Sequence, residues 1–150
     1  MLADLLSKAT EIVSEEYPNS ILLEAKGLPE AGHTINKVGD IQLWQLTFMY
    51  KHIHTVTLDW VCGSFAEPIY NDEITIGLFP IMDFTHLDLA AAISHGLKVT
   101  GESHFLGVTF NHPVVPGITE PRLLFVNRSS EGTRSITMTV SGQTAVRMDP

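Results

Sequence analysis

The chain has 150 residues, of which 44% are hydrophobic, and its formal net charge is −8. This length and composition predict one ordinary domain over residues 1–150 and exclude a largely disordered chain. An acidic balance without any run of Lys or Arg disfavours binding to nucleic acid and to anionic membranes.

Cysteine usage and apolar segments indicate where the protein works. A single cysteine, Cys62, excludes an internal disulfide. No apolar stretch reaches the roughly 18–20 residues that a membrane span needs. The first eight residues contain an early Asp and no basic leader, unlike a secretory signal peptide. We therefore expect a cytoplasmic protein, and a secreted form whose signal has been removed is the alternative.

The first part of the chain predicts a helix followed by strands. Apolar residues recur at three- and four-residue steps over residues 2–16, which indicates an amphipathic helix that Tyr17–Pro18–Asn19 ends. Residues 20–26 are typical of a strand and residues 27–39 of a long loop. Apolar and polar residues then alternate in two further strands that a hairpin near Lys51–His54 would join, at residues 40–50 and 55–62. Residues 65–72 indicate a loop, and residues 74–78 a short strand or an irregular segment.

A second helix and more strands follow. Thr85 as cap, an aspartate three residues on and the closing Gly96 predict a helix over residues 86–95, in which His95 complements the helix dipole in the last turn. The later strands are predicted at 106–110, 122–127 and 135–140, separated by turn-rich segments at 112–120, 128–133 and 141–144. The order predicts an α+β fold, with helices packed on a curved antiparallel β-sheet and two possible repeat halves at 1–82 and 83–150.

Residues 85–147 resemble PepSY-like domains. The resemblance lies in the small-residue helix Leu87–Ile93, the strand Phe105–Phe110, the segment Pro113–Phe125 and the stretch Ile136–Val146, with its Ser141–Gly142 step. It implies helix-plus-sheet architecture and a binding or inhibitory role rather than catalysis. It carries over no catalytic residue and no cofactor.

Seven histidines and the lone cysteine are candidates for chemistry. His52 and His54 would share one strand face and could bind one metal ion, the alternative being two polar residues at a hairpin tip. Cys62 would continue the apolar face of Val56, Leu58 and Trp60 as a buried thiol.

Two groups of apolar residues are candidates for contact with a partner or ligand. Trp44 and Trp60 lie on facing strands, where they either pack in the core or form one wall of a pocket or interface. The Pro- and Gly-rich segment containing Val114, Val115, Pro116 and Ile118 either projects toward a partner or covers a sheet edge.

These observations favour a small non-enzymatic binding protein, such as an inhibitor or immunity-like module acting on a protein partner. The alternative is a small-molecule-binding protein or enzyme with a cystatin-like, cone-shaped sheet and an apolar pocket lined by Trp44, Phe48 and Trp60. A deep pocket with a buried titratable group would favour the alternative, and a filled sheet–helix interface would favour the binding module.

Overall fold

The computed structural model describes residues 2–73, 77–129, 132–139 and 145–148, with side chains up to Asn127. The first half contains a helix, a short 3₁₀ helix and five strands: α1 (Leu2–Glu16), β1 (Ile21–Pro29), η1 (Val38–Asp40), β2 (Ile41–Tyr50), β3 (His54–Val61), β4 (Ser64–Phe65) and β5 (Ile69–Asn71). The second half contains one helix and four strands: α2 (Leu89–Thr100), β6 (Gly107–Asn111), β7 (Arg122–Ser129), β8 (Gly132–Thr139) and β9 (Ala145–Met148).

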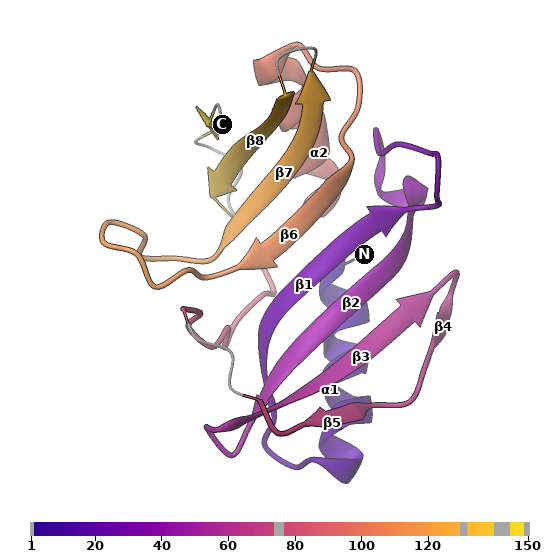
Figure 1. Cartoon of the computed structure of the whole chain (residues 1–150), viewed down its shortest axis with the longest axis vertical. Coiled ribbons are helices and arrows are strands. Elements are labelled where there is room, and N and C mark those ends of the chain that lie inside the picture. Colours follow the sequence, from indigo (N-terminus) through magenta and orange to yellow (C-terminus); the bar gives the residue numbers. More distant parts are fainter. Residues whose placement is uncertain (1, 74–76, 130–131, 140–144, 149–150) are drawn as a thin grey trace.

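Within these described residues, nine strands form one antiparallel sheet in the order β4-β3-β2-β1-β6-β7-β8-β9, with β5 also paired to β3. β1 and β6 lie side by side at the centre, where the first strands of the two halves meet (Figure 1). From this β1–β6 seam, the strands follow chain order outward on both sides. The predicted α+β fold with an antiparallel sheet is confirmed, and the internal repeat stays a prediction.

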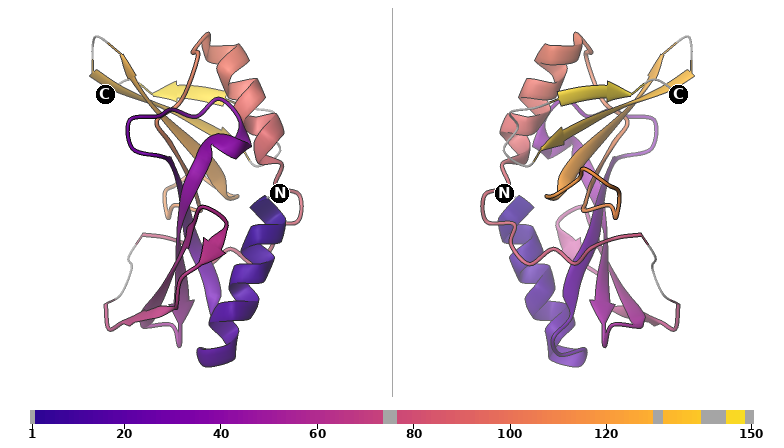
Figure 2. Two further views of the ribbon diagram at one scale, coloured as in Figure 1. Left: turned by 90° about the vertical axis from the view of Figure 1, so that its right-hand side faces the viewer. Right: turned by 90° about the vertical axis from the view of Figure 1, so that its left-hand side faces the viewer.

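Both helices cover the same face of the sheet, α1 behind the first half and α2 behind the second (Figure 2). Leu6, Ala9 and Val13 of α1 are fully buried, as the three- and four-residue spacing predicted. Each large apolar side chain removed from water in this layer contributes about 1.5–3 kcal/mol. None of the helices in the described part of the chain has the length and apolarity to cross a bilayer.

The predicted hairpin between β2 and β3 is confirmed. Trp44 lies opposite Trp60 and Phe48 opposite Val56.

The prediction for Cys62 was wrong, because this residue is exposed. Val61 pairs with Ser64, so the chain leaves β3 after Val61 and turns through Cys62 and Gly63, whose φ angles are 48° and 98°. The thiol therefore lies at a turn and not on the buried face.

The boundaries of α2 differ from the prediction. Asp88, not Thr85, caps the helix, because its carboxylate accepts a hydrogen bond from the Ala91 N–H at 3.0 Å. The helix continues through the buried Gly96 and ends at Gly101, which adopts a left-handed φ of 71°. His95 therefore lies inside the helix rather than in its last turn.

The strands outside the hairpin were predicted less accurately. β1 continues to Pro29, through the start of the predicted loop 27–39. β5 and the second residue of β4, Phe65, lie in the segment predicted as loop, and both strands pair with the outer edge of β3. Two predicted segments lie wholly or partly outside the described residues. These are the turn at 141–144 and residues 74–76 of the predicted strand 74–78.

Candidate functional site

A surface groove lies beside the start of β1 and the end of β2. The linker between β5 and α2 and the β6–β7 loop also contribute to it. It consists of two adjoining hollows of about 490 Å³ and about 650 Å³, which share Ile21, Met49 and His52. We call this the seam groove, because its lining comes from both halves of the chain. Its lining residues are Pro18, Asn19, Ile21, Met49, Tyr50, Lys51, His52, Phe79, Pro80, Met82, His112, Ile118 and Thr119.

The linker reaches the groove because backbone hydrogen bonds fix it to both halves. The Ile81 N–H donates to the Leu22 carbonyl at 2.8 Å, and the Phe79 N–H donates to the His112 carbonyl at 2.8 Å. The Phe79 and His112 rings also pack edge to face, with their centroids 4.9 Å apart. These contacts leave Phe79 44% exposed and Met82 77% exposed at the groove.

The β6–β7 loop forms the opposite wall. His112 Nε2 lies 3.3 Å from the Ile118 carbonyl oxygen and closes the base of the loop. Among the predicted contact residues, Ile118 lines the groove, whereas Val114 and Val115 project from the loop with 51% of each exposed. Pro116 is also exposed. The expectation of exposed apolar side chains in this segment therefore agrees with the structure.

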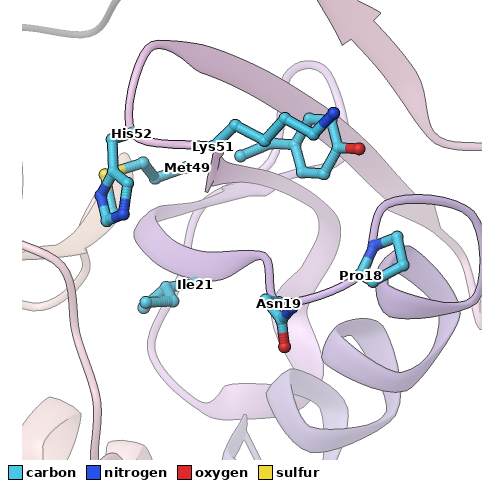
Figure 3. Close-up of a pocket in the computed structure, with 7 residues that line it drawn as sticks. Pro18, Asn19, Ile21, Met49, Lys51 and His52 are labelled. Carbon is cyan, nitrogen blue, oxygen red and sulfur yellow. The ribbon is translucent and has the colours of Figure 1, made fainter.

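The hollow on the β2–β3 side contains unusual backbone. Asn19, Lys51 and His52 have φ angles of 65°, 52° and 65°, in the left-handed region that L-residues rarely adopt (Figure 3). The left-handed conformation costs roughly 1–2 kcal/mol for a residue such as Lys or His, whereas Asn adopts it more readily. Strained backbone of this kind concentrates at functional sites, where the surrounding structure holds it in place. Three such residues in one hollow mark it as a candidate site.

All three tyrosines of the chain meet at this end of the sheet. The ring centroids of Tyr17, Tyr50 and Tyr70 lie 5.3–6.4 Å apart, and Lys51 Nζ lies 5.2 Å from the centroid of the Tyr50 ring. Partial desolvation and nearby carboxylates raise the pKa values of Tyr17 and Tyr70 above 10.0. The three phenol rings therefore pack against one another beside the hairpin tip.

The two tryptophans lie elsewhere. Trp44 is 3% exposed, and both indoles line a hollow of about 230 Å³ beside Leu2, Leu5 and Ile41. Phe48, which the sequence suggested as a third wall, is fully buried and is not among the residues that line this hollow. The small-molecule alternative therefore has a hollow smaller than the 300–1,000 Å³ of typical ligand sites.

The structure separates the two histidines proposed as metal ligands. His52 lies in the turn, so the same-face rule for a strand does not apply to it, and it lines the groove with His112 instead. His54 Nδ1 lies 3.0 Å from Asp72 Oδ1, close enough for an ion pair when the ring is protonated but at an angle too poor for a hydrogen bond. The described residues contain no group of three or more His, Cys, Asp or Glu that could hold a metal ion. Metal binding by His52 and His54 stays a prediction.

Several groove residues escaped sequence reasoning. Phe79 and Met82 lie in a connection with Pro80, the same composition that drew attention to residues 112–118, and that signal could have revealed them. Asn19 and Ile21 gave no such signal, because only the fold brings them beside the hairpin tip. The groove thus offers apolar side chains, imidazoles and one ammonium group, which suit recognition by contact.

Comparison with known proteins supports the fold and gives no activity. No family model matches the chain, and no curated protein matches it. A crystal structure from Clostridium difficile 630, described as that of a "putative lipoprotein", is similar with a TM-score of 0.64 and 7% sequence identity, covering 94% of this chain and 89% of that one. At this identity the likeness shows a shared α+β fold alone. The PepSY-like resemblance stays a prediction.

Proposed function

We propose that this protein is a non-enzymatic binding module that recognises a protein partner through the seam groove, in the manner of an inhibitor or immunity protein. The observation that carries the proposal is the exposure of Phe79 and Met82 on a linker that is otherwise fixed to both halves. Exposed apolar side chains that gather around a hollow, with polar residues at its rim, are the kind of surface that protein partners contact.

The packing of the molecule supports binding at the surface rather than inside it. The space between sheet and helices is filled by fully buried side chains such as Phe48, Phe110 and Leu6. The buried polar residues among those described are Ser20, Thr55 and Asn127, none of which titrates near neutral pH. A filled interface between sheet and helices is expected of a binding module, and the PepSY-like resemblance implies the same role.

The test compares what the wild type and groove variants retain from the native organism. Met82→Glu places a carboxylate in the apolar hollow, and the matched control Val99→Glu changes an exposed residue of α2. We expect a defined protein to be captured by the wild type and by the control and to be lost from Met82→Glu. Loss of an interface hot spot reduces the binding free energy by about 2 kcal/mol or more, which raises the dissociation constant by roughly 30-fold. The same set of proteins on all three chains would contradict the proposal.

The second candidate function is binding of a small apolar compound in the hollow lined by Trp44 and Trp60. A compound bound there would contact both indoles and change their fluorescence. Titration with short fatty acids and aromatic alcohols tests this alternative directly. A saturable change in the wild type, with the same dissociation constant in calorimetry, would favour it over the binding module.

A further inference from the structure

We propose that the larger hollow of the seam groove is a binding site for a soft monovalent metal ion, Cu(I). The donors are two thioethers and two imidazoles, those of Met49, Met82, His52 and His112. This inference goes beyond the proposed function, and each of the two can fail without the other.

The hollow of about 650 Å³ concentrates soft donor atoms. Two of the chain's five methionines and two of its seven histidines line it. The other lining residues are Ile21, Phe79, Pro80, Ile118 and Thr119. No carboxylate lines this hollow, although carboxylate oxygens are the ligands that Ca²⁺ and Mg²⁺ prefer. Thioethers select Cu(I), and imidazole is a good ligand for copper.

Strand pairing brings the two thioethers to the same place. Ile21 of β1 pairs with Met49 of β2. Leu22 pairs with Ile81 of the linker, whose N–H donates to the Leu22 carbonyl at 2.8 Å. Met49 and Met82 therefore flank Ile21, with their backbones about 10 Å apart, because neighbouring strands are spaced by about 5 Å. Both side chains are unbranched and have three rotatable bonds, so they can approach one ion from the two sides.

The imidazoles come from the hairpin turn and from the end of β6. His52 follows Met49 by three residues, and Figure 3 shows the Met49 side chain directed toward the His52 ring. His112 Nε2 lies 3.3 Å from the Ile118 carbonyl oxygen. In the tautomer that donates this hydrogen bond, Nδ1 carries the lone pair that a metal needs. A bond from the other ring nitrogen to a backbone carbonyl is the usual way in which a protein orients a metal-binding histidine.

The surroundings of the donors suit a soft cation. Lys51 lines only the smaller hollow, so no ammonium group is among the residues that line the larger one. The apolar side chains of Ile21, Phe79 and Ile118 limit the contact of a bound ion with water. Met82 is 77% exposed, which leaves a path by which the ion can enter.

Competition with the chelator bicinchoninate under nitrogen measures Cu(I) binding by the full chain. Cys62→Ser is the reference chain, because the exposed Cys62 thiol is itself a soft ligand. In this background, Met49→Leu with Met82→Leu removes both thioethers at nearly constant volume, and His52→Gln with His112→Gln removes both imidazoles. The matched control, His33→Gln with His86→Gln, changes two exposed histidines that do not line the groove.

We expect the reference chain and the control to take one equivalent of Cu(I) from the chelator. Both groove variants should bind it at least about tenfold more weakly. Failure of the reference chain to compete, or equal affinity of the groove variants and the control, would overturn the proposal.

A second measurement does not depend on how well the variants fold. Ag(I) has the same charge and softness as Cu(I) and is not oxidised during the experiment. Titration of the Cys62→Ser chain with Ag(I), followed by NMR of the methionine methyl groups, should shift the Met49 and Met82 signals first. Shifts confined to other methionines would overturn the site. Capture of a protein partner by the metal-free wild type tests the proposed function separately.

Discussion

Gly27→Ala is expected to destabilise the protein by steric conflict at the β1–β6 seam. A Cβ added at Gly27 would lie 2.8 Å from Trp44 Cη2, 2.9 Å from Trp44 Cζ3 and 2.9 Å from Val108 Cγ1. Neither neighbour can move aside easily, because Trp44 and Val108 are 3% and 2% exposed. The residue has no left-handed φ, so the effect isolates packing from backbone conformation.

The magnitude follows from two opposing terms. Overpacking a filled core costs typically 1–3 kcal/mol, and replacing a strand glycine by alanine recovers about 0.5–1 kcal/mol of backbone entropy. The midpoints of these two ranges give an expected net loss of about 1 kcal/mol in the free energy of unfolding. For a chain of this length, that loss lowers the melting temperature by about 2–4 °C.

Urea unfolding followed by tryptophan fluorescence measures this loss, and Gly39→Ala is the matched control, because nothing lies within 4 Å of its added Cβ. Val108→Ala supplies the second side of a double-mutant cycle. It should cost at least ~1 kcal/mol less in the Gly27→Ala background than in the wild type, because it removes one of the clashing atoms. Equal stability of Gly27→Ala and wild type, or additive effects in the cycle, would refute the steric reasoning.

Three further predictions concern local structure. Asp88→Ala removes the hydrogen-bonded cap of α2 and should cost about 0.5–2 kcal/mol in thermal or urea unfolding, whereas Thr85→Ala should change stability by less than about 0.5 kcal/mol. Lys51→Asn with His52→Gly relieves the left-handed turn and should raise the free energy of unfolding by about 1–2 kcal/mol, a gain that fails to appear if the turn is unstrained. Hydrogen bonds from Thr85 hold the pKa of Asp83 below its ordinary 3.8, so its contribution is present above that value and is lost as the pH falls through the lower folded pKa. Urea midpoints at neutral pH and at about pH 2 should therefore differ more for the wild type than for Asp83→Asn, and parallel curves would count against this account.

Local patterns in the sequence were enough to predict much of the fold. The apolar stripe of α1 and the alternation in β2 and β3 depend on neighbours within a few residues, so these three elements and the hairpin between the strands were predicted. The cap of α2 was misplaced because Thr85 and Asp88 are both good capping residues, and only the structure shows Thr85 bonded to Asp83 instead.

Contacts between distant residues account for what the sequence did not reveal. β1 was ended too early because Gly27 suggested a loop, whereas its missing side chain makes room for Trp44. The groove was recognised only in part, through Ile118, because its other wall depends on where Ile81 bonds to Leu22. Such pairings leave no periodic trace in the sequence of either segment.

The pairing of β1 with β6 also removes two exposed strand edges from the sheet. If either half stood apart, a row of backbone donors and acceptors would open beside an apolar core, which is the usual template for self-association. In the sheet, the backbone groups of the two strands pair with each other at the positions from Glu24 to Gly27 of β1. A change that loosens this pairing would therefore promote aggregation and dismantle the binding surface in the same event.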